Sequence, residues 1–220
     1  MKKLYIINYN AGNIASIFNA CTKVAEQNWQ ICITQDPSEL KNADSIIVPG
    51  VGAFDDCINN LIKLGFQEPL KQHCQAKKPL LGICVGMQIF ADYGDENAKT
   101  AREKTAGLGL IAGEVKKITV NSKEVNKIKL PQMGWNNVNF ATNSLGNYHP
   151  IFNKLPSDQD FYFANSYHFI AKEQQNIIAT ARYGGIITAA VAKENICGIQ
   201  FHPEKSGTAG LQVLANFLDL

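Results

Sequence analysis

The chain has 220 residues, of which 45% are hydrophobic and 18% charged, and its formal net charge at pH 7 is +2. This length and composition predict one domain, spanning residues 1–220, that can bury a sizeable core. So small a net charge gives no reason to expect a nucleic acid or an anionic membrane as a partner.

The N-terminal segment and the cysteines argue against further classes of protein. Two lysines lead into a five-residue apolar run that is too short for a signal peptide. No apolar stretch approaches the ~20 residues that span a bilayer, so we expect a cytoplasmic protein. The six cysteines form no CxxC pair, and the four histidines have no companion at ligand spacing. We therefore expect no disulfide framework, no metal and no cofactor.

The first half of the chain alternates short apolar strands with helical patterns. Strands are expected at 4–8, 30–34 and 45–48, and helices at 13–26, 55–64 and 66–75. A further short helix is expected to start at Asp36, a capping residue that is followed by Pro37 at the first helical position and Glu39 at the third. This alternation is typical of a parallel sheet covered on both faces by helices.

The segment Pro49-Gly50-Val51-Gly52 follows the strand at 45–48. Two glycines directly after a strand free the backbone to aim N–H groups, as an oxyanion hole requires. Alone, such a segment is simply a loop. Together with the N–H of Val85, however, Val51 and Gly52 are candidates for an oxyanion hole.

One cysteine lies where a strand changes into a helix. The segment Gly82-Ile83-Cys84-Val85-Gly86 stands between an apolar run at 79–81 and a helical pattern at 87–91. This glycine spacing predicts a nucleophile elbow, a tight turn that exposes the central side chain at a helix N-terminus. The N–H groups and the dipole there favour a thiolate. A lone cysteine is more often a buried small hydrophobe, so the assignment of Cys84 depends on the other segments.

The second half of the chain reads as strands in hairpin-like succession. They are expected at 113–120, 124–130, 136–140, 160–164, 177–182 and 196–199, with a long helix at 206–218. With the first half, this pattern predicts an α/β fold whose central sheet is mixed, mostly parallel and flanked by helices.

A histidine and a carboxylate stand two residues apart just beyond the strand at 196–199. In an extended chain, residues i and i+2 point the same way, so Glu204 can orient His202 while His202 takes a proton from Cys84. The segments that carry Cys84, His202 and the glycine-rich loop all follow apolar strands. Open α/β sheets place their sites at such carboxyl ends.

Taken together, residues 49–52, 82–88 and 202–204 resemble the class I (triad) glutamine amidotransferases, and the likeness runs from the first strand to the last helix. The resemblance implies a flavodoxin-like α/β fold and glutaminase activity. In that activity Cys84 attacks the side-chain amide of glutamine, His202 serves as base and then as acid, and Glu204 orients His202.

The same resemblance implies contacts to glutamine. Buried partners are needed for its α-amino and α-carboxylate groups, since such groups are costly if left unpaired. The positions that match the family's substrate contacts are Gly52, Gln88, Glu96, Asn165, Ser166 and Tyr167. Without the resemblance, Gln88 reads as an exposed helix residue and Tyr167 as an ordinary strand aromatic.

Within the family, the chain most resembles glutaminase subunits that form a heterodimer with a (β/α)8 cyclase of histidine biosynthesis. The resemblance implies that ammonia passes through that barrel, and that a peptide flip in the loop at 49–52 regulates the glutaminase. The matching docking segments are 10–13 and 131–136, with Trp135 as an aromatic anchor. A lysine-rich stretch from Lys116 to Lys129 is either a solvated strand face or a further docking element.

Departures at three positions leave the pathway open. Relatives of the histidine pathway commonly have histidine at the positions of Gln132 and Asn165, and glycine at that of Ala11. A paralogous subunit that feeds a sugar-amidating synthase is therefore the alternative. A silent regulatory module and a cysteine peptidase of related fold are alternatives from other classes. The intact triad argues against the first, and the distal His-Pro-Glu against the second.

The other three histidines are not assigned a catalytic role. We expect His73 on a solvated helix face and His149 in a loop, whereas His168 could approach the site.

Overall fold

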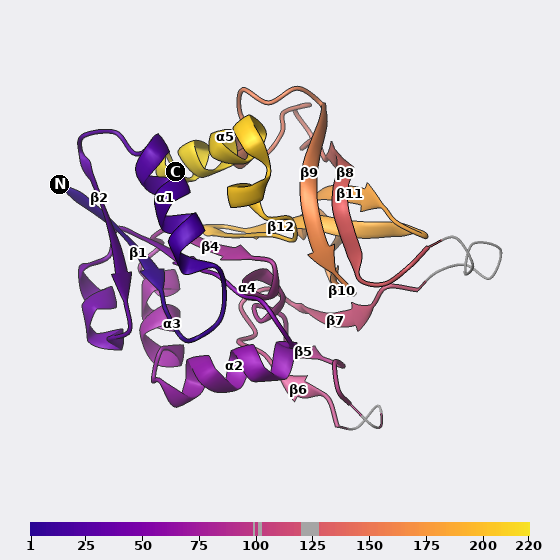
Figure 1. Cartoon of the computed structure of the whole chain (residues 1–220), viewed down its shortest axis with the longest axis horizontal. Coiled ribbons are helices and arrows are strands. Elements are labelled where there is room, and N and C mark those ends of the chain that lie inside the picture. Colours follow the sequence, from indigo (N-terminus) through magenta and orange to yellow (C-terminus); the bar gives the residue numbers. More distant parts are fainter. Residues whose placement is uncertain (99, 101–102, 120–127) are drawn as a thin grey trace.

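Two β-sheets and the helices that cover the larger one make up the structure, a computed structural model that describes residues 1–98, 100, 103–119 and 128–220 (Figure 1). Within these residues the larger sheet has nine strands, in the order β2-β1-β3-β4-β13-β12-β11-β8-β9. The smaller sheet has four strands, in the order β10-β7-β5-β6.

The parallel half of the larger sheet comes mainly from the start of the chain. Its strands are β1 (Lys2–Ile7), β2 (Trp29–Thr34), β3 (Ser45–Val48), β4 (Leu80–Ile83) and β13 (Ile196–Ile199). All neighbours among them run parallel. Strands β3, β4 and β13 are buried along their whole length, which is why they read as continuous apolar runs.

The other half of the sheet is antiparallel, so the expected mixed sheet is confirmed. Its strands are β12 (Ile186–Lys193), β11 (Ile177–Arg182), β8 (Gln132–Phe140) and β9 (Asp158–Asn165). The sequence pattern predicts β11, β8 and β9, although it places the last two too short. It does not predict β12.

The smaller sheet explains one further difference between the expected and the observed strands. It contains β10 (Tyr167–Ala171), β7 (Gly113–Lys117), β5 (Tyr93–Gly94) and β6 (Thr105–Ala106). The strand expected at 113–120 starts as predicted but ends at Lys117, and it pairs with β10 outside the main sheet. The strand expected at 124–130 lies outside the described residues as far as 127, and residues 128–130 are irregular.

Helices cover both faces of the larger sheet (Figure 1). Helices α1 (Ile14–Val24) and α5 (Gly207–Leu218) pack against each other on one side, while α2 (Phe54–Lys63) and α3 (Gln67–Gln75) lie on the other. The short α4 (Val85–Gln88) follows β4 directly. Of the helices among the described residues, none is long and apolar enough to cross a membrane.

Four 3₁₀ helices complete the described part of the chain: η1 (Pro37–Asn42), η2 (Pro150–Phe152), η3 (Gln174–Asn176) and η4 (Pro203–Lys205). The short helix expected at Asp36 is η1, and the Asp36 side chain accepts a hydrogen bond of 2.9 Å from the N–H of Ser38. The cap is therefore as predicted, and the helix it starts is of the tighter 3₁₀ kind.

The solvated position expected for His73 is wrong. Helix α3 packs on η1, which turns His73 inward until it is buried. Its Nε2 lies 3.0 Å from the carbonyl oxygen of Pro79, and burial lowers the pKa of this histidine. His73 thus holds α3 to the segment that enters β4.

Candidate active site

Three neighbouring strands end at the site. β4 lies between β3 and β13 in parallel register, with Val48 and Gly198 both opposite Gly82. The chain leaves β3 into the 49–52 loop, β4 into Cys84, and β13 into the segment that carries His202. Segments far apart in sequence therefore meet at the carboxyl ends of adjacent strands, as expected for an open α/β sheet.

Cys84 occupies a strained turn between β4 and α4. Its φ of 56° and ψ of −115° lie where non-glycine residues are rare. Its own N–H donates to the carbonyl oxygen of Ile199 at 2.8 Å, and its carbonyl accepts from the N–H of Met87 at 3.0 Å. These bonds fix the turn from both sides, so that the thiol lines the cavity described below.

Close backbone packing around the elbow requires glycine. A Cβ on Gly86 would lie 1.9 Å from the carbonyl oxygen of Val48, and one on Gly82 would lie 2.6 Å from that of Gly86. No side chain fits at either distance. The predicted role of the two glycines, to let helix and strand approach closely, agrees with this geometry.

His202 and Glu204 form a buried pair. Nδ1 of His202 lies 2.9 Å from Oε1 of Glu204, and both side chains are almost inaccessible to solvent. The backbone differs from the extended chain that we expected, because Pro203 starts the 3₁₀ helix η4 and Glu204 lies inside it. The histidine is held from behind by Ser206, whose hydroxyl donates to its carbonyl oxygen at 2.6 Å.

The environment of His202 favours the imidazolium. Burial by itself lowers the pKa of His202, but hydrogen bonds to Cys84 and Glu204, together with the negative charges of these two groups, outweigh it and raise the pKa to about 10. A protonated His202 between a carboxylate and a cysteine sulfur is the arrangement that stabilises a thiolate nucleophile.

Gln200 is a contact that the sequence pattern alone does not identify. Its Nε2 lies 3.6 Å from the sulfur of Cys84, and its Oε1 accepts a 2.9 Å hydrogen bond from Nε2 of Gln88. Gln88 also donates to the carbonyl oxygen of Tyr167 at 3.0 Å. A usable signal is present, because Gln200 stands two residues before His202 and can point to the same side of an extended segment.

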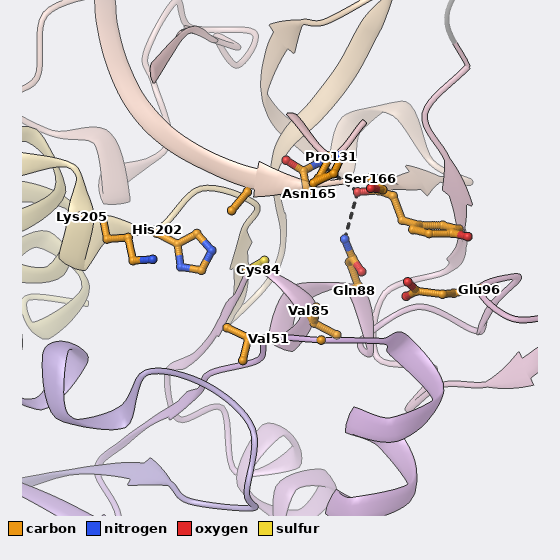
Figure 2. A pocket seen from close by; sticks show the side chains of 13 residues that line it. Val51, Cys84, Val85, Gln88, Glu96, Pro131, Asn165, Ser166, His202 and Lys205 are labelled. Atoms are coloured by element: carbon orange, nitrogen blue, oxygen red, sulfur yellow. Dashed lines mark hydrogen bonds between the residues drawn. The ribbon is translucent and has the colours of Figure 1, made fainter. Parts of the chain in front are cut away.

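The site surrounds a cavity of about 290 Å³ (Figure 2). Its lining includes every expected site residue except Glu204, which lies behind His202, and adds Pro131, Ala164 and Lys205. Figure 2 shows Cys84 between His202 on one side and Gln88 on the other, with Glu96 beyond Gln88. Asn165 and Ser166 lie on the wall opposite Val51 and Val85.

Glu96 joins the cavity to the start of α2. Its Oε2 accepts a 2.8 Å hydrogen bond from the N–H of Phe54. Burial raises the pKa of Glu96, and the nearby carboxylates of Asp55, Asp56 and Asp95 act in the same direction, whereas the bond from Phe54 opposes them. A cationic amine in the cavity is the partner that such a carboxylate needs.

Two of the three positions that depart from the histidine-pathway pattern lie together. Gln132 on β8 is paired in register with Asn165 on β9, and the two side chains are only 2% and 5% exposed. Nδ2 of Asn165 donates to the carbonyl oxygen of Tyr167 at 3.0 Å. Asn165 therefore lines the cavity, and Gln132 lies beside it on the neighbouring strand.

The remaining histidines stay outside the cavity. His149 precedes η2 in a loop, as expected, and His168 lies on β10, where its Nδ1 accepts from the N–H of Thr188 at 3.4 Å. Burial lowers the pKa of both. Within the described residues no group of three His, Cys, Asp or Glu side chains is placed to hold a metal ion.

Comparison with known proteins matches this chain over nearly its whole length. The family model described as glutamine amidotransferase class-I matches residues 6–220. Imidazole glycerol phosphate synthase subunit HisH of Pelagibacter ubique is 42% identical over 217 residues, which cover 98% of each chain. The subunit of the same name from Bradyrhizobium diazoefficiens is 40% identical over 221 residues, covering 97% of this chain and 96% of its own.

Solved structures agree on the fold. PurLQS from Thermotoga maritima has a TM-score of 0.71 at 17% identity, covering 99% of this chain and 98% of that chain. A putative GMP synthase subunit from Thermoplasma acidophilum has a TM-score of 0.68 at 20% identity, covering 100% of this chain and 93% of its own. At these identities the likeness concerns architecture alone.

Proposed function

The chain belongs to the class-I glutamine amidotransferase family, and we propose that it is the glutaminase subunit of an imidazole glycerol phosphate synthase. The observation that carries the proposal is that Cys84 and His202 meet at one cavity, with Glu204 paired to His202 behind it. Relatives named as HisH subunits, at 36–42% identity over nearly the full chain, support the same assignment.

The proposed reaction uses the triad in two steps. The thiolate of Cys84 attacks the side-chain amide carbon of glutamine, and the N–H groups of Val51, Gly52 and Val85 are the candidates to stabilise the oxyanion. His202 then gives its proton to the amide nitrogen, so that ammonia leaves and a thioester remains. Water attacks the thioester with His202 as the base, and glutamate is released. Glu204 keeps the imidazole in orientation throughout.

The cavity walls suit a small zwitterionic substrate. Glu96 is the proposed partner of the α-ammonium group, since it is a half-buried carboxylate whose charged neighbours are themselves carboxylates. Both N–H bonds of the Gln88 amide are used by Tyr167 and Gln200, so its oxygen is the atom left for glutamine. Asn165, Ser166 and Tyr167 form the opposite wall and are proposed to meet the α-carboxylate.

The proposed partner is the (β/α)8 cyclase subunit, which receives the ammonia in a heterodimer. Met133 and Trp135 alternate along β8 and are exposed, and β8 begins one residue after Pro131 in the cavity wall. An exposed apolar face beside a cavity is typical of a protein interface. The isolated chain is proposed to be a poor glutaminase that the ligand-loaded partner activates through the 49–52 loop.

The sugar-amidating alternative has less support. It depends on departures at partner-facing positions, but Ala11, Gln132 and Asn165 are all buried and do not lie on an exposed docking face. The names of the relatives also favour the histidine pathway.

The test separates glutamine hydrolysis from ammonia use. In the complex with the cyclase, Cys84→Ala should abolish formation of imidazole glycerol phosphate from glutamine and keep its formation from ammonium salts, because the synthase site lies on the other chain. Cys32→Ala, which removes a half-buried thiol on β2, is the control and should keep both activities. Loss of both activities in Cys84→Ala with partner binding intact contradicts this division. A wild-type chain that supports no cyclase turnover at all points to the sugar-amidating alternative.

A further inference from the structure

Gln200 is held beside Cys84 by the pairing of the central strands. Strands β13 and β4 are in register with Ile199 opposite Ile83, so Gln200 is the first residue beyond β13 and Cys84 the first beyond β4. The N–H of Cys84 donates to the carbonyl oxygen of Ile199 at 2.8 Å. The N–H of Gln200 donates to the carbonyl oxygen of Ala189 on β12 at 2.8 Å. The strand register therefore fixes the two backbones relative to each other.

A chain of hydrogen bonds decides which end of the Gln200 amide faces the sulfur. The carbonyl oxygen of Tyr167 can only accept, so the Gln88 amide turns its nitrogen toward it, at 3.0 Å (Figure 2). The same nitrogen donates to Oε1 of Gln200 at 2.9 Å. With its oxygen bound in this way, Gln200 presents its Nε2 to Sγ of Cys84 at 3.6 Å. The sulfur therefore faces an N–H donor whose direction is fixed.

An N–H donor at this position favours the charged form of the sulfur. A thiolate is a much better hydrogen-bond acceptor than a neutral thiol, so the bond is stronger once the proton has left. The side chain of Gln200 is fully buried, and the described residues that line the cavity do not include it. Gln200 is thus placed to act on the sulfur and not on bound glutamine.

We propose that Gln200 is a further catalytic residue, an N–H donor that helps to hold the sulfur of Cys84 in its ionised form and is itself oriented by Gln88. The inference rests on the proposed function, in which the thiolate attacks glutamine. It gives Gln88 a second role besides its proposed contact with the substrate, because its amide nitrogen sets the direction of the Gln200 amide.

The experiment measures how fast iodoacetamide alkylates Cys84 in the free chain as a function of pH, with the labelled peptide quantified by mass spectrometry. The thiolate is the form that reacts, so the midpoint of this profile reports the ionisation of Cys84 together with His202. Gln200→Met keeps the length of the side chain and removes the donor. The midpoint should rise by about one pH unit, at the low end of the effect of one hydrogen bond to a charged group. The rate at the alkaline plateau should not fall, since a more basic thiolate is a better nucleophile.

Glutamine hydrolysis by the complex with the ligand-loaded cyclase provides a second readout. The acid limb of kcat/KM against pH reports the ionisation of the free enzyme, so Gln200→Met should move this limb upward by the same amount. At pH values well below the limb the variant should be about tenfold slower than the wild type, and at the plateau it should be no slower. A merely structural defect would instead lower the rate at every pH.

Two further variants test the orientation of the amide, and a third is the control. Gln88→Met removes the donor that binds the Gln200 oxygen, so either end of that amide can turn to the sulfur. The alkylation midpoint should then rise, but by less than in Gln200→Met. The double variant should match Gln200→Met, because Gln88 acts on the sulfur only through Gln200. Gln132→Met replaces another glutamine that is only 2% exposed and should leave the midpoint unchanged.

An unchanged midpoint in a Gln200→Met chain that is folded and binds the cyclase overturns the inference. If Gln200→Met does not fold, an unchanged midpoint in Gln88→Met overturns it. A double variant whose midpoint lies above that of Gln200→Met overturns the orienting role of Gln88. A wild-type complex that releases no glutamate although Cys84 is alkylated as expected contradicts the proposed function instead, so the two failures are distinguishable.

Discussion

At the scale of single residues, the site combines strain with burial. The positive φ of Cys84 costs roughly 1–3 kcal/mol in a non-glycine residue, and the surrounding hydrogen bonds and packing sustain it. The side chain of Glu204 is fully buried, and one of its oxygens, Oε2, has no hydrogen-bond partner among the described residues. A buried carboxylate of this kind is tolerated because the imidazolium of His202 lies against its other oxygen.

Replacing the catalytic base should reduce glutaminase activity more than replacing the carboxylate that orients it. His202→Ala removes the group that moves the proton in both steps, so glutaminase activity should fall almost as far as in Cys84→Ala. Glu204→Gln keeps the shape and an oxygen acceptor, and should retain roughly 10- to 100-fold more activity than His202→Ala. Steady-state glutamate release in the activated complex measures both. A Glu204→Gln variant less active than His202→Ala shows that the roles are assigned wrongly.

The raised pKa of His202 also predicts how stability changes with pH. The folded chain holds this proton up to a pH of about 10, whereas the unfolded chain releases it near the ordinary value of 6.5. The contribution to stability is therefore complete below pH 6.5 and disappears as the pH rises to about 10. The difference in unfolding free energy between wild type and His202→Gln should shrink across this range, as measured by urea denaturation.

A second variant identifies the source of that pH dependence. Because Cys84 helps to raise the pKa of His202, the same comparison in a Cys84→Ala background should show a smaller decline. An equal decline in both backgrounds means that Cys84 does not interact with the imidazolium.

At the scale of elements, the site depends on how tightly α4 lies against β3 and β4. Much of this could be predicted from sequence, because buried parallel strands read as apolar runs and paired glycines mark the elbow. Strand β12 could not, since its buried inner residues include Thr188 and three alanines, and alanine is depleted in strands. Nor could the 3₁₀ turn at Glu204, where the short-range effect of Pro203 decides the backbone.

The close packing at the elbow predicts that one added methyl group lowers the unfolding free energy strongly. In Gly86→Ala the new Cβ would lie 1.9 Å from the carbonyl oxygen of Val48, a backbone atom that cannot yield without moving β3. We expect a loss of about 3 kcal/mol or more in unfolding free energy, at the upper end of overpacking effects. Gly185→Ala is the control, because its Cβ would meet only the carbonyl oxygen of Thr119 at 4.0 Å, and it should change stability by less than about 0.5 kcal/mol. Equal melting temperatures for the two variants contradict this packing.

At the scale of the whole molecule, the order of the strands brings the proposed catalytic residues into one site. The convergence of 49–52, Cys84 and His202 could be foreseen, because all three follow apolar strands. The opposite wall of the cavity could not be predicted from the sequence pattern alone, since β9 and β10 bring Asn165 and Tyr167 to the cavity through long-range pairing. The contact of Gln200 with Cys84 joins residues 116 positions apart, so its sequence signal is only the place of Gln200 two residues before His202.

The exposed face of β8 supplies the last prediction. Trp135 is 59% exposed and stands opposite Tyr162 in register. Its ring packs edge-on against the ring of Tyr162, with the two centroids 6.2 Å apart, and this contact restrains the exposed side chain. An exposed aromatic on the strand that follows Pro131 of the cavity wall suits an anchor for the proposed cyclase, and Trp135→Ala should weaken binding about 30-fold, equivalent to about 2 kcal/mol. Leu145→Ala is the matched control, since Leu145 is 82% exposed in the turn beyond the far end of β8. Titration of the cyclase, followed by stimulated glutamate release, should give the higher Kd for Trp135→Ala alone and the same rate at saturation. If both variants bind as the wild type does, the cyclase docks elsewhere than on β8.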